Sequence, residues 1–388
     1  MKKYNFDEVV PRSDTDCVKY DLRKVYFGTE DVIPMWVADM DFCTPDFIIN
    51  AIRERLQHEV LGYSIRPERF NKAIIDWMKL QHDWDIRKSW ISFSPGVVPA
   101  LNMLVLAFTK PGDKIIVQPP VYYPFFSAIQ ANGRIKVDNP LKLQNGRLCM
   151  DFEDLKNKAK EAKMILISHP QNPGGSVWRE DELRKLAEIC LENNVLMVSD
   201  EIHSDLIFAP NKHIPLASIS KEIAQQTITC NAPSKTFNVA GLSTAYLITP
   251  NREHYRRYNH KLNEELHLSM GNIFGNIALV AAYENGKAWL GQLLDYVAEN
   301  IRLVEDFCKK YLPMIIPIVP ESTYMIWLDC RRMGLTGDDM KDFFIKKARV
   351  GFNDGRVFGE GGEGFMRMNV ACQRATLLEA LKRIKNAF

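Results

Sequence analysis

The middle of the chain alternates apolar, strand-like segments with a helical pattern, and no other feature of the sequence limits the fold as strongly. An apolar segment at 164–167 is followed by a helical pattern at 180–191, whose leucines recur on one face. Two further strand-like segments lie at 193–199 and 227–231. Strands that alternate with helices in this way form parallel or mostly parallel sheets. The sequence therefore predicts an α/β fold with a mostly parallel central sheet flanked by helices.

The length of the chain predicts two domains. At 388 residues it exceeds what one hydrophobic core usually serves. Past about Asn285 a long helical pattern leads to a proline-rich stretch and then to strands with helices on one side. We expect a large domain at 46–285 and a smaller α+β domain at 286–388, with 1–45 forming an N-terminal arm and part of the small domain.

Composition and charge exclude several classes of protein. The 50 Lys and Arg residues nearly balance the 48 Asp and Glu residues, which argues against a nucleic-acid or membrane surface. No signal-peptide pattern follows Met1, and no apolar run reaches the length of a membrane span. The eight cysteines form no C-x-x-C pair, and no His cluster has metal-ligand spacing. We expect a cytoplasmic enzyme without a metal, a nucleic-acid partner or a membrane contact.

Two polar side chains with complementary chemistry follow strands of the predicted sheet. Asp200 comes at the carboxyl end of one strand, and Lys235 follows the next one. Open α/β sheets bind ligands at this edge. A lysine amine bonds covalently to the aldehyde of pyridoxal phosphate, and a buried carboxylate keeps the pyridine nitrogen of that cofactor protonated. The pair predicts a pyridoxal phosphate site; the structural alternatives are a helix cap for Asp200 and a solvated surface position for Lys235.

The chain also contains groups that could bind the phosphate of the same cofactor. Gly96 precedes a predicted helix, so the backbone N–H groups of Gly96, Val97 and Val98 are expected to hold the phosphate, with the hydroxyl of Ser234 added. Such helix starts usually bind nothing, so this motif supports a pyridoxal phosphate site only in combination with Asp200 and Lys235.

Two further residues follow strands of the predicted sheet. Tyr122 comes after the strand at 114–118, and its ring is expected to lie flat on the pyridine ring. Asn172 lies in an Asn-Pro-Gly-Gly turn after another strand and is expected to donate its amide to the ring oxygen or to a substrate carboxylate. A core tyrosine and an ordinary turn are the structural alternatives.

The order of these groups along the chain resembles a known superfamily. Tyr122, Asn172, Asp200 and Lys235 are arranged as in the fold-type I pyridoxal phosphate enzymes of the class I/II aminotransferase superfamily, and the resemblance covers nearly the whole chain. Within it, four segments resemble the MalY/PatB-type cystathionine β-lyases, a branch of carbon–sulfur lyases. These segments are 34–42 (PMWVADMDF), 94–99 (SPGVVP), 200–203 (DEIH) and 234–238 (SKTFN).

Two departures from the aminotransferase pattern support this branch. Ser243 stands eight residues beyond Lys235, where aminotransferases commonly have an arginine that contacts the phosphate. His203 stands three residues beyond Asp200, where they commonly have a tyrosine. The resemblance implies that His203 either faces the cofactor or braces Asp200, and the sequence leaves this choice open.

The resemblance also assigns substrate and interface residues. Arg367, in a late strand, is expected to bind the substrate carboxylate through two parallel hydrogen bonds. Trp36 to Ala38 are expected to line the substrate entrance, although a buried Met-Trp pair is equally typical of a core. Tyr63 matches a tyrosine that reaches the phosphate of the neighbouring subunit, which implies a homodimer with shared active sites.

The resemblance thus implies a β-lyase that acts on L-cystathionine or a related sulfur amino acid and forms pyruvate, ammonia and a thiol. Lys235 is expected to remove the α-proton, and Tyr122 to protonate the departing sulfur. One alternative is an aminotransferase that transfers the amino group to a 2-keto acid. An alternative of another class is a regulator that binds a transcription factor through a protein contact.

Overall fold

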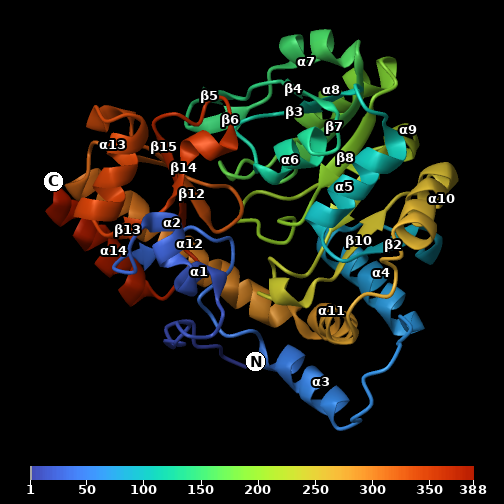
Figure 1. Ribbon diagram of the computed structural model, residues 1–388, viewed down its shortest axis with the longest axis horizontal. Coiled ribbons are helices and arrows are strands. Elements are labelled where there is room, and N and C mark those ends of the chain that lie inside the picture. The colour runs from blue at the N-terminus through green and yellow to red at the C-terminus, as the bar shows by residue number, and fades with distance from the viewer. Residues whose placement is uncertain (1) are drawn as a thin grey trace.

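A seven-stranded sheet forms the centre of the computed structural model, which describes residues 2–388 (Figure 1). Only β10 runs antiparallel to its two neighbours, and the other neighbouring strands pair in parallel. The predicted mostly parallel sheet is therefore confirmed. The strands in spatial order are β2 (Ile91–Ser94), β10 (Ala245–Ile248), β9 (Thr227–Asn231), β8 (Leu196–Asp200), β7 (Ala162–Ser168), β3 (Lys114–Val117) and β4 (Ile135–Asp138).

Helices cover both faces of this sheet. Successive side chains of β7 enter different apolar clusters: Met164 and Leu166 belong to one, Ile165 and Ile167 to the other. This burial on both faces explains why the strands are continuous apolar runs in the sequence. The first cluster includes α4 (Glu68–His82), α5 (Val97–Phe108), α6 (Pro124–Gln130) and α11 (Ile273–Asn285); the second includes α7 (Phe152–Ala159) and α8 (Glu180–Glu192).

A second, antiparallel sheet lies beside the first and is built from the C-terminal part of the chain (Figure 1). The 25-residue helix α12 (Lys287–Tyr311) packs against β11 and α14. The short strand β1 (Ile33–Pro34) pairs with β13 (Val350–Gly351), so the N-terminal segment joins this part of the molecule. The exact domain boundaries stay a prediction. The sheet has the order β11 (Ile316–Ile318), β12 (Met325–Asp329), β15 (Phe365–Asn369), β14 (Asn353–Asp354), and α14 spans Arg374–Ala387.

Short elements complete the fold. The helices are α1 (Val18–Asp21), α2 (Arg23–Phe27), α3 (Asp46–Leu56), α9 (Lys221–Gln225), α10 (Arg252–His260) and α13 (Gly337–Asp342), and a hairpin pairs β5 (Lys142–Gln144) with β6 (Arg147–Cys149). Turns of 3-10 helix occur at Lys88–Trp90, Leu216–Ser218, Ala240–Leu242, Arg331–Met333 and Gly355–Phe358, and π-helical turns at Lys261–Glu265 and Phe343–Lys347. Within residues 2–388, no helix is both long and apolar enough to cross a membrane.

The strand register places the loops that follow the strands at one edge of the sheet. Ser168 at the end of β7 lies opposite Asp200 at the end of β8, and Asp200 lies opposite Cys230 near the end of β9. Because parallel strands end at the same edge, the segments that follow them converge there. This edge is where the sequence places its candidate residues.

Gly175 joins the loop after β7 to the segment before β12. Its carbonyl accepts hydrogen bonds from the Ser322 hydroxyl at 2.9 Å and from the Glu321 backbone N–H at 3.1 Å. The φ of Gly175 is +74°, and a Cβ at this position would lie 2.4 Å from the Cβ of Pro320. Only glycine permits this approach without strain.

We expect Gly175→Ala to lower the free energy of unfolding by about 2–4 kcal/mol, because it adds an overpacking cost to that of a left-handed backbone. Gly146→Ala is the matched control: φ is +75° there, but nothing lies within 4 Å of the added Cβ. The control should lose only about 1–2 kcal/mol. Urea unfolding of both variants measures the difference, and equal losses would show that the contact with Pro320 does not require glycine.

Candidate active site

A cavity opens at the carboxyl edge of the parallel strands and gathers most of the predicted site residues. Its volume is about 190 Å³, whereas one water needs roughly 10–15 Å³ on a comparable measure, so the cavity has room for a small molecule. Ten predicted site residues line it: Ala38, Gly96, Val97, Val98, Tyr122, Asn172, Asp200, His203, Ser234 and Lys235.

Asp200 ends β8 and presents a buried carboxyl group to the cavity. One of its oxygens accepts the backbone N–H of Ile202 at 3.1 Å. Burial raises the pKa of Asp200 to about 7, although this hydrogen bond and the nearby Lys235 amine act in the opposite direction. A cation bound beside Asp200 would restore its charge. The protonated nitrogen of a pyridine ring is such a cation.

Lys235 reaches the same cavity from the segment after β9, and its Nζ donates to the backbone carbonyl of Ala38 at 2.8 Å. Burial lowers the pKa of Lys235 to about 8, and Arg367 lowers it further, against the opposing effects of Asp39 and Asp200. A lowered pKa leaves more of the amine neutral and able to react with an aldehyde.

The start of α5 supplies an anion site at one end of the cavity. Gly96 is the N-cap residue of this 12-residue helix, and no side chain among residues 2–388 caps the helix there. The first N–H groups of the helix therefore lack helical partners, and the helix dipole favours a negative charge beside them. Ser234 and Ser243 also line the cavity. This set of N–H and hydroxyl groups fits a phosphate.

Tyr122 and His203 both line the cavity, Tyr122 partly buried and His203 buried, and both are uncharged near neutral pH. Burial raises the pKa of Tyr122 to about 12, so its hydroxyl keeps its proton. Burial lowers the pKa of His203 to about 3, so its ring stays neutral. The Nδ1 atom of His203 has no hydrogen-bond partner among residues 2–388. An unpaired buried nitrogen that lines a cavity is available to a ligand.

Arg367 lies just behind the cavity wall. Its Nη1 donates to the side-chain oxygen of Asn172 at 3.0 Å, while Nη2 donates to the carbonyl of Trp36 at 2.9 Å and to Asn353 at 2.7 Å. Burial lowers the pKa of Arg367 to about 10, so it remains a cation near neutral pH. Its Nε has no partner within the described residues. Asn172, with its oxygen engaged, keeps its NH₂ group as a donor.

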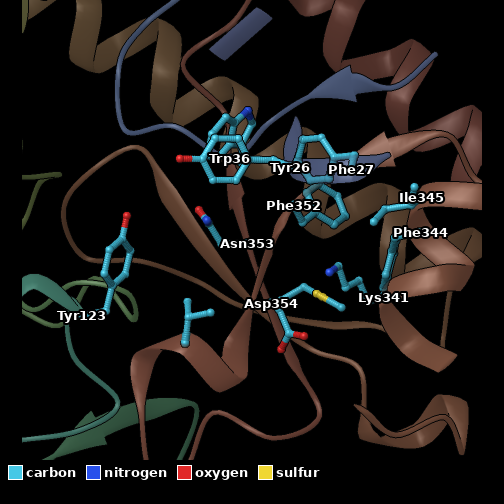
Figure 2. Close-up of a pocket in the computed structure, with 12 residues that line it drawn as sticks. Tyr26, Phe27, Trp36, Tyr123, Lys341, Phe344, Ile345, Phe352, Asn353 and Asp354 are labelled. Carbon is cyan, nitrogen blue, oxygen red and sulfur yellow. The ribbon is translucent and has the colours of Figure 1, made fainter. Parts of the chain in front are cut away.

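Besides Arg367, the predicted residues Trp36 and Tyr63 also lie outside the lining of this cavity. The Trp36 ring lines a neighbouring cavity, drawn in Figure 2, and only the backbone carbonyl of Trp36 contacts Arg367. Tyr63 lies on the surface with 98% of its area exposed, so it takes no part in the cavity of its own chain. Ala38, by contrast, belongs to the cavity lining, and its role at the substrate entrance stays a prediction.

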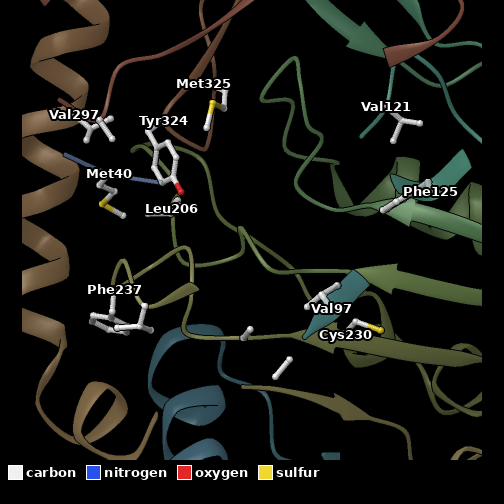
Figure 3. Close-up of a cluster of buried hydrophobic side chains, with 14 of the residues drawn as sticks. Met40, Val97, Val121, Phe125, Leu206, Cys230, Phe237, Val297, Tyr324 and Met325 are labelled. Carbon is white, nitrogen blue, oxygen red and sulfur yellow. The ribbon is translucent and has the colours of Figure 1, made fainter. Parts of the chain in front are cut away.

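The sequence did not reveal the side chains that hold segment 36–42 against the cavity. Asn238 makes three hydrogen bonds of 3.0 Å to backbone groups of this segment, and Asn369 donates to two of its carbonyls at 2.6 Å. Tyr324, which belongs to the apolar cluster drawn in part in Figure 3, donates its hydroxyl to Ala38 at 3.1 Å. Of these three residues, only Asn238 lies in a segment that the family resemblance singled out, the SKTFN segment.

A second unpredicted feature is a buried cluster of His169, Glu201 and His213. The sequence spacing indicated no such cluster, yet ligand atoms of these three side chains lie within 4.8 Å of one another. Hydrogen bonds already engage both Glu201 oxygens: His213 at 2.9 Å, the Ser199 hydroxyl at 2.8 Å and the Leu216 N–H at 3.1 Å. We interpret the cluster as a hydrogen-bonded support beneath the strand end that carries Asp200.

Comparison with known proteins places this arrangement in a family. The model of the aminotransferase class I and II family matches residues 30–384. The chain is 43% identical to cystathionine beta-lyase PatB of Bacillus subtilis over 385 residues, which cover 99% of each chain. It is 32% identical to protein MalY of Escherichia coli, over 99% of this chain and 98% of MalY.

A solved structure gives the same result. The PLP-bound C-S lyase from Staphylococcus hominis superposes with a TM-score of 0.93 at 34% identity, covering 100% of this chain and 98% of that one. The predicted fold-type I architecture is therefore confirmed.

The raised pKa of Asp200 predicts a pH-dependent loss of stability in the cofactor-free protein. Between the ordinary pKa of 3.8 and about 7, the folded state keeps a proton that the unfolded state releases, so stability falls as the pH rises. The loss amounts to at most about 4 kcal/mol, because one pKa unit corresponds to about 1.4 kcal/mol. Urea unfolding of wild type and Asp200→Asn at about pH 4.5 and about pH 8 measures it.

Only the difference between the two proteins reports on Asp200. Glu201, whose pKa burial also raises, is present in both and affects both alike. We expect the wild type to lose more stability than Asp200→Asn over this range. Parallel pH profiles would mean that Asp200 is not a destabilised carboxylate in the cofactor-free fold.

Proposed function

The chain belongs to the aminotransferase class I and II family, and we propose that it is a pyridoxal-phosphate-dependent carbon–sulfur β-lyase. The resemblance to the MalY/PatB branch is confirmed by the identities with both proteins. The proposed reaction converts L-cystathionine or a related cysteine thioether and one water to a thiol, pyruvate and ammonium. The observation that carries the proposal is the meeting of Lys235, Asp200 and the free start of α5 around one cavity.

The residues of the cavity fit pyridoxal phosphate group by group. Asp200 would hold the pyridine nitrogen, Lys235 the aldehyde carbon, and the start of α5 with Ser234 the phosphate. His203 offers its unpaired nitrogen, and Tyr122 offers its ring. When bound, the cofactor withdraws electrons from the α-carbon of an amino acid.

The side chains of this protein then supply binding and proton transfer. Arg367 and the NH₂ group of Asn172 bind the substrate carboxylate, because a buried guanidinium without an ion-pair partner among residues 2–388 favours an anion. Lys235 takes the α-proton on its Nζ, a role favoured by its lowered pKa. Tyr122, which keeps its proton, donates it to the departing sulfur. The carbon–sulfur bond breaks with its electron pair on sulfur.

The residues at the phosphate end of the cavity favour a β-lyase function over an aminotransferase function. Ser243 lines the cavity where an aminotransferase commonly places an arginine, and no charged side chain other than Asp200 and Lys235 lines it among the described residues. A cytoplasmic location, consistent with the absence of any paired cysteine in residues 2–388, belongs to the same proposal. The identities with cystathionine beta-lyases favour the lyase over a regulatory role through a protein partner.

The first test is release of pyruvate and free thiol from L-cystathionine by the cofactor-loaded protein, with and without an added 2-keto acid. We expect release without the keto acid. We expect Lys235→Ala to lower the rate by at least about 10²–10⁴-fold, because the variant loses its general base. Lys309→Ala, a change at an exposed lysine, is the control and should keep the wild-type rate. Turnover that requires a keto acid would make the protein an aminotransferase.

A homodimer with shared active sites completes the proposal. Tyr63 is fully exposed in the single chain, and its neighbours Val60, Leu61 and Ile65 expose between 57% and 85% of their areas. An exposed apolar segment of this kind is typical of an interface. We propose that Tyr63 donates its hydroxyl to the phosphate bound by the other subunit.

Complementation between two inactive variants tests this proposal. We expect Tyr63→Ala and Lys235→Ala homodimers to be impaired, and their mixture, after exchange of subunits, to regain up to about a quarter of wild-type activity. Half of the randomly paired dimers are mixed, and each mixed dimer has one site with both Lys235 and the opposite Tyr63. No activity in mixed dimers, isolated through a different affinity tag on each variant, would mean that Tyr63 does not act across the interface.

A further inference from the structure

A second cavity lies beside the candidate active site, and six aromatic rings surround it (Figure 2). Its volume is about 340 Å³, at the lower end of the roughly 300–1,000 Å³ of small-molecule sites. We call it the aromatic pocket. The rings belong to Tyr26, Phe27, Trp36, Tyr123, Phe344 and Phe352.

Arg367 connects the aromatic pocket to the active site. One end of its guanidinium donates to Asn172, which lines the active-site cavity, and the other donates to Trp36 and Asn353, which line the aromatic pocket. The rings of Tyr122 and Tyr123, one in each cavity, lie 5.3 Å apart. A substrate whose carboxylate rests on Arg367 therefore has the aromatic pocket within reach of the rest of its chain.

The inner wall of the aromatic pocket is fixed before any ligand arrives. Trp36 exposes 7% of its area, its Nε1 donates to the Lys19 carbonyl at 3.1 Å, and its ring lies 4.2 Å from that of Tyr26. Phe352 and Phe344 are buried, whereas Tyr26 and Tyr123 are half exposed and form the rim. A rigid aromatic wall with an open rim favours a flat apolar group, since few side chains must be ordered on binding.

Lys341 places an amine at the pocket. Its amine points into the pocket between Phe352 and Asp354 (Figure 2). No carboxylate of residues 2–388 lies within ion-pair distance of this amine. The nearby carboxylates of Asp338 and Asp354 are instead paired with Arg356, at 2.7 Å and 2.5 Å. The Lys341 amine is therefore open to direct pairing with an anionic group of a ligand.

We infer that the aromatic pocket receives the group attached to the substrate sulfur and that Lys341 pairs with a carboxylate at the far end of that group. The inference rests on the proposed β-lyase function and narrows its substrate class. The preferred substrates are cysteine thioethers with a bulky aromatic substituent that ends in an acid. The thiol released is then an aromatic thiol acid.

The test compares three substrates of the cofactor-loaded protein: S-methyl-, S-benzyl- and S-(4-carboxybenzyl)-L-cysteine. We expect kcat/KM, measured by pyruvate release, to rise at least about tenfold from methyl to benzyl, because apolar groups that fill a pocket discriminate by this factor or more. The carboxybenzyl substrate should exceed the benzyl one by about 2–5-fold, the factor expected for a solvent-exposed ion pair.

Charge variants isolate the role of Lys341. We expect Lys341→Met to remove the preference for carboxybenzyl over benzyl and Lys341→Glu to reverse it. Lys382→Glu, a change at an exposed lysine on α14 outside the pocket, is the matched control and should keep the wild-type ratio. Because Lys341 is exposed at the surface, its variants are expected to fold.

Each failure has a separate meaning. Equal or faster turnover of S-methyl-L-cysteine than of S-benzyl-L-cysteine would overturn the pocket assignment and leave the lyase intact. A preference for carboxybenzyl that survives Lys341→Glu would overturn the role of Lys341. No pyruvate from any thioether, L-cystathionine included, would overturn the proposed function itself.

Discussion

The guanidinium of Arg367 donates hydrogen bonds to three segments that are far apart in the sequence: the loop after β7, the N-terminal segment and β14. All of its hydrogen-bond partners among residues 2–388 are neutral oxygens, so no ion pair within this part of the chain offsets its charge. Removing such a charge from water costs several kcal/mol, and neutral acceptors repay only part of that cost. An anionic substrate supplies the missing part. Arg367, which bonds to segments of both sheets, is therefore also a residue whose charge a substrate carboxylate would stabilise.

The second constraint is the path of segment 36–42, which is bonded both to Asn369 of β15 and to Asn238 in the segment after β9. Side chains from distant parts of the chain hold its backbone: Asn238 near the active site, Asn369 at the end of β15 and Tyr324 before β12. Their combined effect is to fix the carbonyl of Ala38, which in turn accepts the Lys235 amine at 2.8 Å. The position of the reactive nitrogen thus depends on contacts that no single element provides.

Sequence patterns predicted the sheet and most of the cavity because both follow from local rules. Continuous apolar runs mark strands buried on both faces, and parallel strands end together, so Asp200 and the groups after β3, β7 and β9 had to converge. The patterns did not predict the roles of Asn369 or Tyr324, since ordinary residue types acquire them through contacts across about 290–330 positions. The direction of the Trp36 ring, into the aromatic pocket, was likewise set by tertiary packing.

Burial pushes the ionisable groups of the cavity toward neutrality: the pKa of Asp200 rises to about 7, while those of Lys235 and His203 fall to about 8 and about 3. A ligand with a cationic ring and an anionic tail would lower the pKa of Asp200 again, because opposite charges stabilise each other where water is excluded. Binding and ionisation are then coupled, and the cofactor stabilises the fold that holds it. With Ser243 in place of a cation, the anionic tail depends on the start of α5. Backbone N–H groups are always protonated, so the donors in this half of the site do not change their charge at any pH at which the fold persists.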